Sequence, residues 1–514
     1  MSGTHENKSN QVNSTLSMGA APETNISQSG PETEMRTLII GVGATGCMTI
    51  DRMRSGESSM PGNPVVAVDD DPGKLGKEFA GITVEGTCED IPRVVEEFGV
   101  SQIVFAIPSA TREQRMRIYD ICLKTEVRVL AVPSSLLGTP VKTVEKVPIK
   151  QVGATELLSR PEIMLDTDEA VGIIEGKTVL VTGGGGSIGS EICRQIAAMG
   201  PAKVIIFDIY ENTAYELYRE LLNEYGSIAK ERFVVEIGSI RDSERLWEVF
   251  DAYSPQVVFH AAAHKHVPLM EHNPREAVLN NVFGTLNVAK LAVEWDVERF
   301  VLISTDKAVN PTNVMGVTKR MCEMIMQRYA KVSPTVFTAV RFGNVLGSHG
   351  SVIPLFKIQI ANGGPVTVTH KDVTRYFMTI PEASRLVIQA AALAKGGEIF
   401  VLDMGEPVRI YDLAEKLIRL SGFEPGKDIE IKVTGLRPGE KLYEELMMDE
   451  EQGKMRRTEH NKIFVASPRD IDLAVFYQQL QDLAAAAQHN DEGVVDQLEK
   501  MIPTFTPTRK NLKV

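Results

Sequence analysis

The dipeptide Asp306-Lys307 places a carboxyl group beside an amine at the end of the apolar run 299–303. A carboxylic acid can give a proton and a neutral amine can take one, so the pair could work as general acid and base. In an exposed loop the same pair would be a solvated ion pair of little effect. The apolar run predicts a buried strand, whose end is a common position for catalytic groups in α/β proteins. This favours the acid–base interpretation, with Thr305 and Lys319 as neighbouring candidates.

A glycine-rich turn at 183–189 provides a place for a cofactor. It follows the apolar run 177–182 and precedes a predicted helix at 190–199, with glycines in GxxGxxG spacing. Such a turn lets backbone N–H groups and a helix dipole meet a pyrophosphate. We expect it to bind a dinucleotide through Thr182, Gly183, Gly186, Ser187, Ile188 and Gly189. A glycine turn without a cofactor is the alternative.

The nucleotide is predicted from Asp208, which ends the next strand at 203–208. A carboxylate there accepts hydrogen bonds from ribose hydroxyls and repels a 2′-phosphate. No arginine stands beside Asp208 in the run 208–212, so the pattern favours NAD over NADP.

A first glycine loop, Gly41 to Gly46, also follows an apolar run, and Asp69 ends the second strand there. Its spacing is GxGxxG, which is weak evidence by itself because any tight strand–helix turn favours glycine. No residues suited to catalysis follow this loop. A bound nucleotide and a purely structural or regulatory domain both remain open.

The alternation of apolar runs and helical periods predicts an α/β protein with two Rossmann-like, doubly wound parallel-sheet domains. Residues 1–35 are polar and predicted to be a disordered tail. The first domain is expected at 36–148, a connector at 149–175, the second domain at 176–505 and a tail at 506–514. The pattern loosens after residue 348, which indicates a smaller substrate-binding lobe, and two helices are expected near 473–488 and 492–501.

Composition limits the class of protein. The 514 residues are 43% hydrophobic and 24% charged, as in a soluble globular protein. The net charge of −13 argues against a nucleic-acid partner. The five cysteines are scattered without a CxxC pair, so we expect no disulfide frame and no metal site. No apolar run approaches the ~18 residues of a membrane span, and we expect a cytoplasmic protein.

Seven motifs carry a resemblance to a known family. They are TGGGGSIG at 182–189, AAAHKHVP at 261–268, STDKAVNP at 304–311, MGVTK at 315–319, RFGNV at 341–345, TRYFM at 374–378 and RPGEK at 437–441. Over about residues 36–505 the chain resembles the extended short-chain dehydrogenase/reductases. Among these it is similar to the bacterial polysaccharide-biosynthesis group of UDP-N-acetylglucosamine 4,6-dehydratases.

The resemblance implies roles for the catalytic segment. In the wider superfamily a tyrosine four residues before the lysine deprotonates the sugar hydroxyl, but here Met315 precedes Lys319. A thioether cannot take a proton; such a methionine alone would be a core residue, whereas in this motif it resembles the subgroup that retains configuration at C5. Thr305 and Asp306 are then the candidates for handling the C4 hydroxyl proton.

The mechanism expected from this resemblance begins with NAD removing hydride from C4. Lys307 then takes the C5 proton, Asp306 protonates the departing C6 hydroxyl, and hydride returns to C6. This requires a neutral Lys307, and we expect burial, Lys319 and the oxidised nicotinamide to depress its pKa.

The resemblance also implies the remaining contacts. Cofactor contacts are expected from Ser239, Ile240, Ala261, Ala262 and Ala263, with Ser239 standing where the family usually has Asp against the adenine. Contacts to a UDP-sugar are expected from Lys265, Asn344, Arg437 and Glu440. A surface turn is the alternative for the segment of Arg437 and Glu440, and the run 264–266 lines the site without binding metal.

Two rival functions stay open. An NAD-dependent nucleotide-sugar 4-epimerase would share the fold, but it needs no acid and base aimed at C5 and C6 and normally keeps the tyrosine. A non-catalytic nucleotide-sensing protein would commonly have lost Asp306, Lys307 or Lys319. The exact sugar, the downstream glycan, the group that deprotonates the C4 hydroxyl and the true translation start are left open, and a homo-oligomer is expected.

Overall fold

A computed structural model describes residues 35–55, 62–107, 110–111, 114, 117–118, 121–125, 127–131, 150–151 and 167–507, the last range with gaps at 349, 422, 448–455, 467–472 and 490. The predicted tail at 1–35 therefore lies outside the described residues apart from Met35. The same holds for most of the connector at 149–175 and for residues 508–514.

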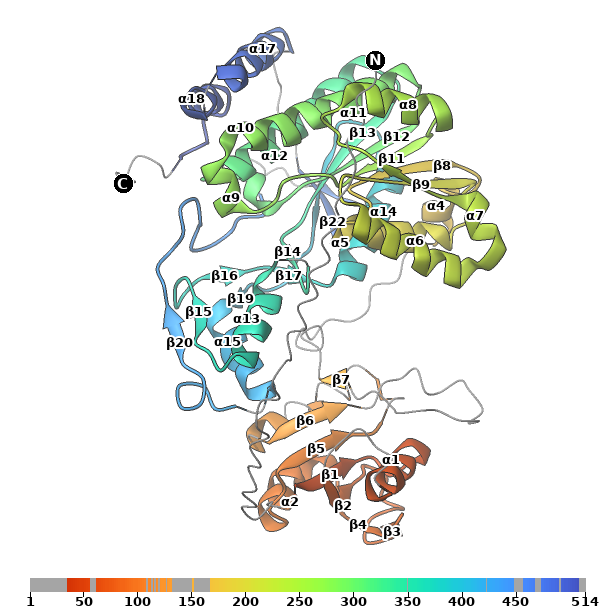
Figure 1. The fold of residues 1–514 in the computed structure, drawn as a ribbon, viewed down its shortest axis with the longest axis vertical. Coiled ribbons are helices and arrows are strands. Elements are labelled where there is room, and N and C mark those ends of the chain that lie inside the picture. Colours follow the sequence, from red (N-terminus) through yellow and green to blue (C-terminus); the bar gives the residue numbers. More distant parts are fainter. Residues whose placement is uncertain are drawn as a thin grey trace, which may run out of the picture.

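The first sheet has the order β3-β4-β2-β1-β5-β6-β7. Its strands are β1 (Arg36–Ile40), β2 (Asn63–Val68), β3 (Glu78–Phe79), β4 (Ile82–Gly86), β5 (Gln102–Phe105), β6 (Arg128–Ala131) and β7 (Lys150–Gln151). Strands β4, β2, β1, β5 and β6 are parallel, and β3 and β7 add antiparallel edges. Helices α1 (Ala44–Arg54) and α2 (Ile91–Glu97) accompany it (Figure 1).

The second sheet has the order β10-β9-β8-β11-β12-β13-β18-β22-β21. Its strands are β8 (Thr178–Thr182), β9 (Lys203–Asp208), β10 (Phe233–Ile237), β11 (Val257–His260), β12 (Arg299–Ile303), β13 (Val336–Arg341), β18 (Ile399–Leu402), β21 (Arg456–Arg457) and β22 (Ile463–Ala466). The first seven are parallel, and β22 and β21 are antiparallel. Chain order reverses between β8 and β11, which is where doubly wound sheets bind ligands.

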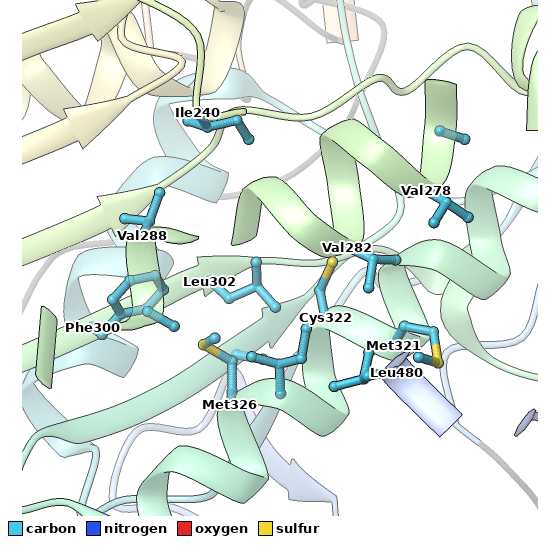
Figure 2. Packing of buried hydrophobic residues seen from close by; sticks show 14 of the residues in the cluster. Ile240, Val278, Val282, Val288, Phe300, Leu302, Met321, Cys322, Met326 and Leu480 are labelled. Carbon is cyan, nitrogen blue, oxygen red and sulfur yellow. The ribbon is translucent and has the colours of Figure 1, made fainter. Parts of the chain in front are cut away.

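Two apolar layers cover the faces of this sheet. Helices α8 (Ser243–Tyr253), α11 (Gly284–Glu294) and α12 (Val314–Val332) pack on one face, and α17 (Leu473–His489) and α18 (Asp491–Met501) join the same core. Figure 2 shows this packing, with Met321 of α12 and Leu480 of α17 in view. Helices α5 (Ser187–Ala197), α6 (Glu211–Tyr225) and α14 (Ile380–Leu393) cover the opposite face. Covering both faces explains why the strands are continuous apolar runs.

A separate apolar cluster marks the smaller lobe. It is formed by α13 (Val352–Ala361), β15 (Val366–Val368), α15 (Ile410–Leu420) and residues near β20 (Ile431–Val433). Two short pairs connect it to the rest: β14 (Asn344–Val345) with β17 (Phe377–Met378), and β16 (Thr374–Arg375) with β19 (Val408–Arg409). In Figure 1 these pairs lie between the large sheet and the lobe.

The structure confirms the α/β fold class and corrects two details. The stretch after residue 348 is not all lobe, because α14, β18 and β22 return to the large sheet. The helix predicted at 190–199 begins at Ser187, since Gly186 is extended at its N-cap, so Ser187, Ile188 and Gly189 form its first turn. The two terminal helices are confirmed as α17 and α18.

Candidate active site

Thr305, Asp306 and Lys307 form a hydrogen-bonded group directly after β12. The Thr305 hydroxyl donates to Oδ1 of Asp306 at 2.8 Å, and Nζ of Lys307 donates to the same oxygen at 3.0 Å. The Asp306 side chain is fully buried, and its N–H donates to the carbonyl of Phe342 at 3.1 Å. Oδ2 of Asp306 has no hydrogen-bond partner among the described residues. An unmatched buried acceptor calls for an explanation, and a catalytic role is one.

Lys307 is surrounded by acceptors. Besides Asp306, its Nζ donates to Oδ1 of Asn344 at 3.3 Å and lies 3.7 Å from Oε1 of Glu444. Burial by itself lowers the pKa of Lys307, but the carboxylates of Asp306 and Glu444 outweigh it, and the net direction is upward. The expected net lowering of the Lys307 pKa is therefore wrong, although burial acts in the expected direction. The physical reason is the pair of carboxylates beside the amine.

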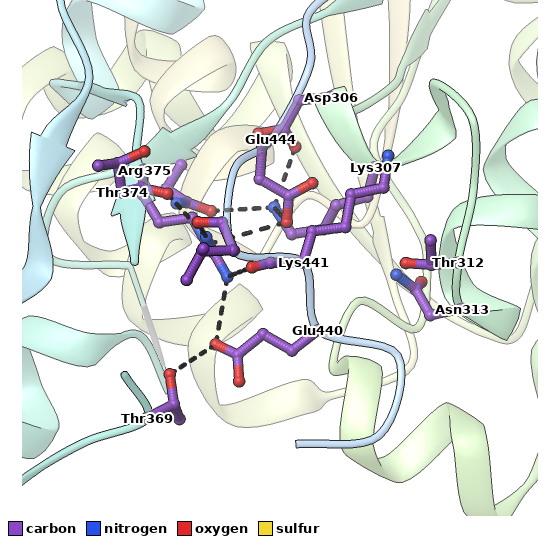
Figure 3. Close-up of polar contacts among 12 residues, drawn as sticks. Asp306, Lys307, Thr312, Asn313, Thr369, Thr374, Arg375, Glu440, Lys441 and Glu444 are labelled. Carbon is purple, nitrogen blue, oxygen red and sulfur yellow. Dashed lines mark hydrogen bonds and ion pairs between the residues drawn. The ribbon is translucent and has the colours of Figure 1, made fainter. Parts of the chain in front are cut away.

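Glu444 is a candidate residue that the sequence motifs did not reveal. It is buried, and burial raises its pKa against the opposing effect of Lys307. Its Oε1 also lies 3.8 Å from Nε of Arg375 (Figure 3). The sequence signal is faint, because Glu444 and Glu445 stand side by side just beyond the RPGEK motif, and nothing in their types separates them.

Arg375, at the end of β16, holds the segment 440–444 in place. Its guanidinium donates to the carbonyls of Thr374 at 2.7 Å and Lys441 at 2.9 Å, and to Oε1 of Glu440 at 3.2 Å. A planar guanidinium that donates hydrogen bonds to several partners fixes their relative positions. The segment that carries Glu444 is thus fastened to β16, which pairs with β19.

Helix α12, which carries Met315 and Lys319, begins against the turn of Lys307. Its cap residue Asn313 accepts from the N–H of Gly316 at 2.7 Å and donates to the carbonyl of Gly439 at 3.0 Å. A Cβ on Gly316 would lie 2.1 Å from the Lys307 carbonyl oxygen, so only glycine allows this approach. Met315 is 4% exposed and belongs to the apolar core.

Lys319 is a buried amine with an unusual environment. It is 5% exposed, and burial lowers its pKa. Its amine makes no hydrogen bond or ion pair with any residue that the structure describes. Buried amines are ordinarily paired, which makes Lys319 a candidate contact for a bound ligand.

The glycine turn after β8 has the geometry of a phosphate-binding loop. Gly183 has φ +67°, and a Cβ there would lie 2.6 Å from the backbone nitrogen of Ala262, while a Cβ on Gly189 would lie 2.1 Å from the Gly183 carbonyl oxygen. No side chain caps α5, so the N–H groups of Ile188 and Gly189 in its first turn have no side-chain acceptor at the helix N-terminus. Asp208 accepts from the N–H groups of Gly185 and Tyr210, both at 2.9 Å, which orients its carboxylate toward this loop.

The other predicted cofactor residues differ in their burial and in their hydrogen bonds. The Thr182 hydroxyl is buried and lies 2.7 Å from Nδ1 of His260, and the Thr182 carbonyl accepts from the N–H of Ala261 at 3.0 Å. Ser239 uses its hydroxyl to accept from the N–H of Arg241 at 3.2 Å, and Ile240 is buried in the core. Residues Ala261, Ala262 and Ala263 are half-buried directly after β11, beside the glycine turn.

The predicted sugar-nucleotide residues lie in two places. Asn344, on β14, contacts Lys307 as described above. The Glu440 carboxylate is engaged by the chain itself, accepting from Thr369 at 3.1 Å, from Arg375, and from the backbone and side chain of Arg437. Arg437 is 57% exposed and Lys265 is exposed. Glu440 therefore orients Arg437 in this structure, and a contact to the ribose stays a prediction.

Comparison with known proteins settles the family. The model of a family described as "Polysaccharide biosynthesis protein" matches residues 179–468, more than half of the chain. The chain belongs to this polysaccharide biosynthesis family. A probable polysaccharide biosynthesis protein, EpsC of Bacillus subtilis, is 52% identical over 415 residues, which cover 80% of this chain and 68% of that protein.

Two other relatives of this chain carry names with different activities. A UDP-N-acetylglucosamine 4,6-dehydratase (inverting) of Campylobacter jejuni is 34% identical over 277 residues, 53% of this chain and 78% of that protein. A UDP-glucose 4-epimerase of Rickettsia rickettsii is 32% identical over 348 residues, 66% of this chain and 98% of that protein.

The N-terminal part of this family member matches a second model, a CoA-binding domain, over residues 26–133. Its loop repeats features of the turn after β8. Gly41 has φ +88°, a Cβ on Gly46 would lie 1.9 Å from the Gly41 carbonyl oxygen, and Asp69 accepts from the N–H of Val42 at 2.9 Å. Unlike Asp208, Asp69 is also paired with Lys74 at 2.9 Å. Ligand binding here remains open.

None of the helices in the described parts of the chain has the length and apolar character needed to cross a bilayer. No group of three or more His, Cys, Asp or Glu side chains is arranged to hold a metal ion within those same residues.

Proposed function

We propose that this protein is an NAD-dependent 4,6-dehydratase of UDP-N-acetylglucosamine. The observation that carries the proposal is the buried Asp306–Lys307 pair, joined by a 3.0 Å hydrogen bond at the carboxyl end of β12. Elimination of water across C5 and C6 needs one group to take a proton from C5 and another to give a proton at C6. An epimerase acting at C4 needs neither. The substrate is proposed from the name of the C. jejuni relative.

The residues present fit a bound dinucleotide. The turn at Gly183–Gly189 offers backbone N–H groups to a pyrophosphate, and Asp208 offers a carboxylate to the adenosine ribose. The amine of Lys319, which has no hydrogen-bond partner among the described residues, would supply a donor to the ribose beside the nicotinamide. When bound, NAD supplies the means to take hydride from C4 and to return it to C6.

Lys307 and Asp306 would carry the elimination itself. The C4 ketone acidifies the C5 proton, the neutral Lys307 amine takes it, and the C5–C6 double bond forms as the C6–O bond breaks. Asp306, in its acid form, donates a proton to the departing hydroxyl so that water leaves. Lys307 then returns its proton to C5 as hydride reaches C6.

This scheme leaves one proton to be placed, the one released from the C4 hydroxyl. Asp306, ionised at this stage, receives it as hydride leaves C4, and this is the proton that Asp306 later gives to the departing C6 hydroxyl. Thr305 lies on that route, since its hydroxyl already donates to Oδ1 of Asp306 at 2.8 Å. We therefore assign Thr305 and Asp306 to the C4 hydroxyl, in place of the tyrosine that Met315 replaces.

Lys265 and Arg437 are the cations proposed to face the diphosphate, and Asn344 is proposed to position the sugar beside Lys307. We propose that the configuration at C5 is retained, because Met315 resembles the methionine of the configuration-retaining subgroup. The C. jejuni relative is named as inverting, so the C5 configuration of the product, read by proton NMR coupling constants, is a separate test from dehydration.

The deciding experiment incubates the purified protein with NAD and UDP-N-acetylglucosamine and follows the nucleotide sugar by mass spectrometry. Loss of one water supports the dehydratase. Unchanged mass with inverted C4, seen by NMR, would identify an epimerase instead. No change with several UDP-hexoses would favour a protein that binds nucleotides without turnover.

A further inference from the structure

The Lys307 amine lies between two carboxylates of different origin. Asp306 precedes it in the chain, with Oδ1 at 3.0 Å from Nζ. Glu444 comes from the segment that Arg375 holds, with Oε1 at 3.7 Å from Nζ. The side chains of Asp306, Lys307 and Glu444 are 0%, 16% and 4% exposed, so solvent screens their charges weakly.

Other charged side chains lie near Asp306, Lys307 and Glu444, and each has a partner. Arg375 faces Glu444 at 3.8 Å and Glu440 at 3.2 Å, and Lys441 also acts on Glu444 electrostatically. Glu440 is shared with Arg437, and Lys441 pairs with the exposed Glu445 at 3.0 Å. The carboxylate that acts on Lys307 from outside its own turn is therefore that of Glu444.

The proposed reaction needs Lys307 as a neutral amine and Asp306 as an acid. Asp306 becomes the acid when it takes the C4 hydroxyl proton, so Lys307 must lose its own proton to solvent water. The N–H bond breaks, the proton joins water, and the pair changes from charges of +1 and −1 to charges of 0 and −1 before the C4 hydroxyl reacts. An ionised Glu444 opposes this step because it attracts the ammonium form. It also repels the Asp306 carboxylate, but this effect on Glu444 is smaller than that of Lys307.

We propose that Glu444 is a positioning residue for the proposed dehydration, whose ionised carboxylate holds Lys307 as an ammonium and whose protonated form lets Lys307 lose its proton and act as the neutral base. The inference rests on the proposed function for its link to turnover. Its electrostatic part concerns the free protein and can be measured without substrate.

The sign of the pH dependence follows. Burial raises the pKa of Glu444, so the carboxyl stays protonated to a higher pH than an ordinary glutamate. As pH rises through that pKa, the carboxylate forms and the ammonium of Lys307 is stabilised. Neutral Lys307 becomes more abundant as pH rises, but in the wild type this gain in turnover should level off over this range because Glu444 ionises. In Glu444→Gln turnover should keep rising with pH, because the amide does not ionise.

The test is competitive labelling of Lys307 with acetic anhydride across pH, read by peptide mass spectrometry. Only a neutral amine reacts. In Glu444→Gln the midpoint should move to lower pH by one unit or more, which is about a tenfold higher labelling rate at a fixed pH below the midpoint. Glu444→Asp keeps a carboxylate and should stay close to the wild type. Glu445→Gln removes the neighbouring exposed charge and should leave Lys307 labelling unchanged.

Several results would overturn the inference. These are an unshifted profile in Glu444→Gln, a shift of equal size in Glu445→Gln, or a glutamine-like profile in Glu444→Asp. Circular dichroism checks folding; if Glu444→Gln unfolds, Glu444→Ser, which is smaller and neutral, must give the same shift. In the turnover arm, the ratio of kcat for Glu444→Gln to wild type should rise several-fold with pH at similar KM. A wild type that labels as expected but does not dehydrate would refute the proposed function and not the electrostatic coupling.

Discussion

Glu323 and Arg341 form a two-point ion pair that is fully buried and joins α12 to β13. Oε1 of Glu323 accepts from Nε of Arg341 at 2.7 Å, and Oε2 accepts from its Nη2 at 2.8 Å. Arg320 and Ser304 donate to the same carboxylate at 2.9 and 2.7 Å. The pair thus connects the helix that carries Lys319 with the strand that leads to Asn344, next to the segment of Asp306.

Replacing Glu323 by glutamine should destabilise the protein by roughly 3–5 kcal/mol, because two buried guanidinium groups lose their counter-charge. Burial would raise the pKa of Glu323, but Arg341 and Arg320 outweigh it and lower the pKa to about 2 from an ordinary 4.5. This stabilisation is present above the ordinary pKa and lost as pH falls toward the folded value. Urea unfolding should show the wild type weakening from pH 4.5 to 2 far more than the variant. The exposed Glu294→Gln on α11 serves as control, and an equal urea midpoint in both variants would contradict the assignment.

Lys307→Met should abolish the loss of water from the nucleotide sugar, because no amine remains to take the C5 proton. General-base contributions of this kind are typically about 10²–10⁴-fold in rate. The affinity for NAD, measured by isothermal titration, should change little, since the proposed contacts to the cofactor lie elsewhere. Lys230→Met, at the exposed surface of α7 (Ala229–Arg232), should behave as the wild type in both assays. Dehydration at the normal rate in Lys307→Met would rule out this base.

Asp208→Ala should weaken NAD binding, because the variant loses the carboxylate that is proposed to face the ribose and that accepts from the N–H groups of Gly185 and Tyr210. We expect a rise in Kd of about tenfold or more, equivalent to one charge-assisted hydrogen bond of roughly 1.5–3 kcal/mol. Binding of NADP should weaken less or improve, since repulsion of the 2′-phosphate is also removed. Calorimetric titration of both nucleotides measures the ratio, with Asp251→Asn on α8 as control. An unchanged NAD-to-NADP ratio would mean that Asp208 does not face the ribose.

Gly316→Ala should be destabilising and should reduce activity, although alanine favours a helix by about 1 kcal/mol over glycine. The added Cβ would lie 2.1 Å from the Lys307 carbonyl and would push the turn of Asp306 and Lys307 away from α12. Gly172→Ala is the matched control, because it ends helix α4 (Thr167–Gly172) and a Cβ there meets nothing within 4 Å. Thermal unfolding of the two variants should shift in opposite directions or leave Gly172→Ala unchanged. Equal shifts would show that the contact with Lys307 does not matter.

Much of the catalytic half follows from local chemistry that a sequence displays. The glycines at 183, 186 and 189, an acidic residue at the end of the next strand and fully apolar strands predict a doubly wound sheet, and the structure has it. The sequence pattern predicts the start of α5 three residues late, because Ser187 and Ile188 resemble loop residues. The extended backbone of Gly186 makes Ser187 the first helical residue. The return of β18 and the antiparallel β22 was not predicted, since both depend on pairing between residues far apart in the chain.

The candidate site also has features that are local in the sequence and features that depend on the tertiary structure. The adjacency of Thr305, Asp306 and Lys307 and the methionine at 315 are local, so the sequence by itself determined which acid and base are available and which tyrosine is missing. Only the tertiary structure decided the charge on that base. Glu444 and Glu445 are neighbours of one type, and the fastening of their segment by Arg375 turns Glu444 toward Lys307 while leaving Glu445 at the surface with Lys441. A pKa depends on the distances between charges and on their burial, and both are set by contacts between residues more than a hundred positions apart.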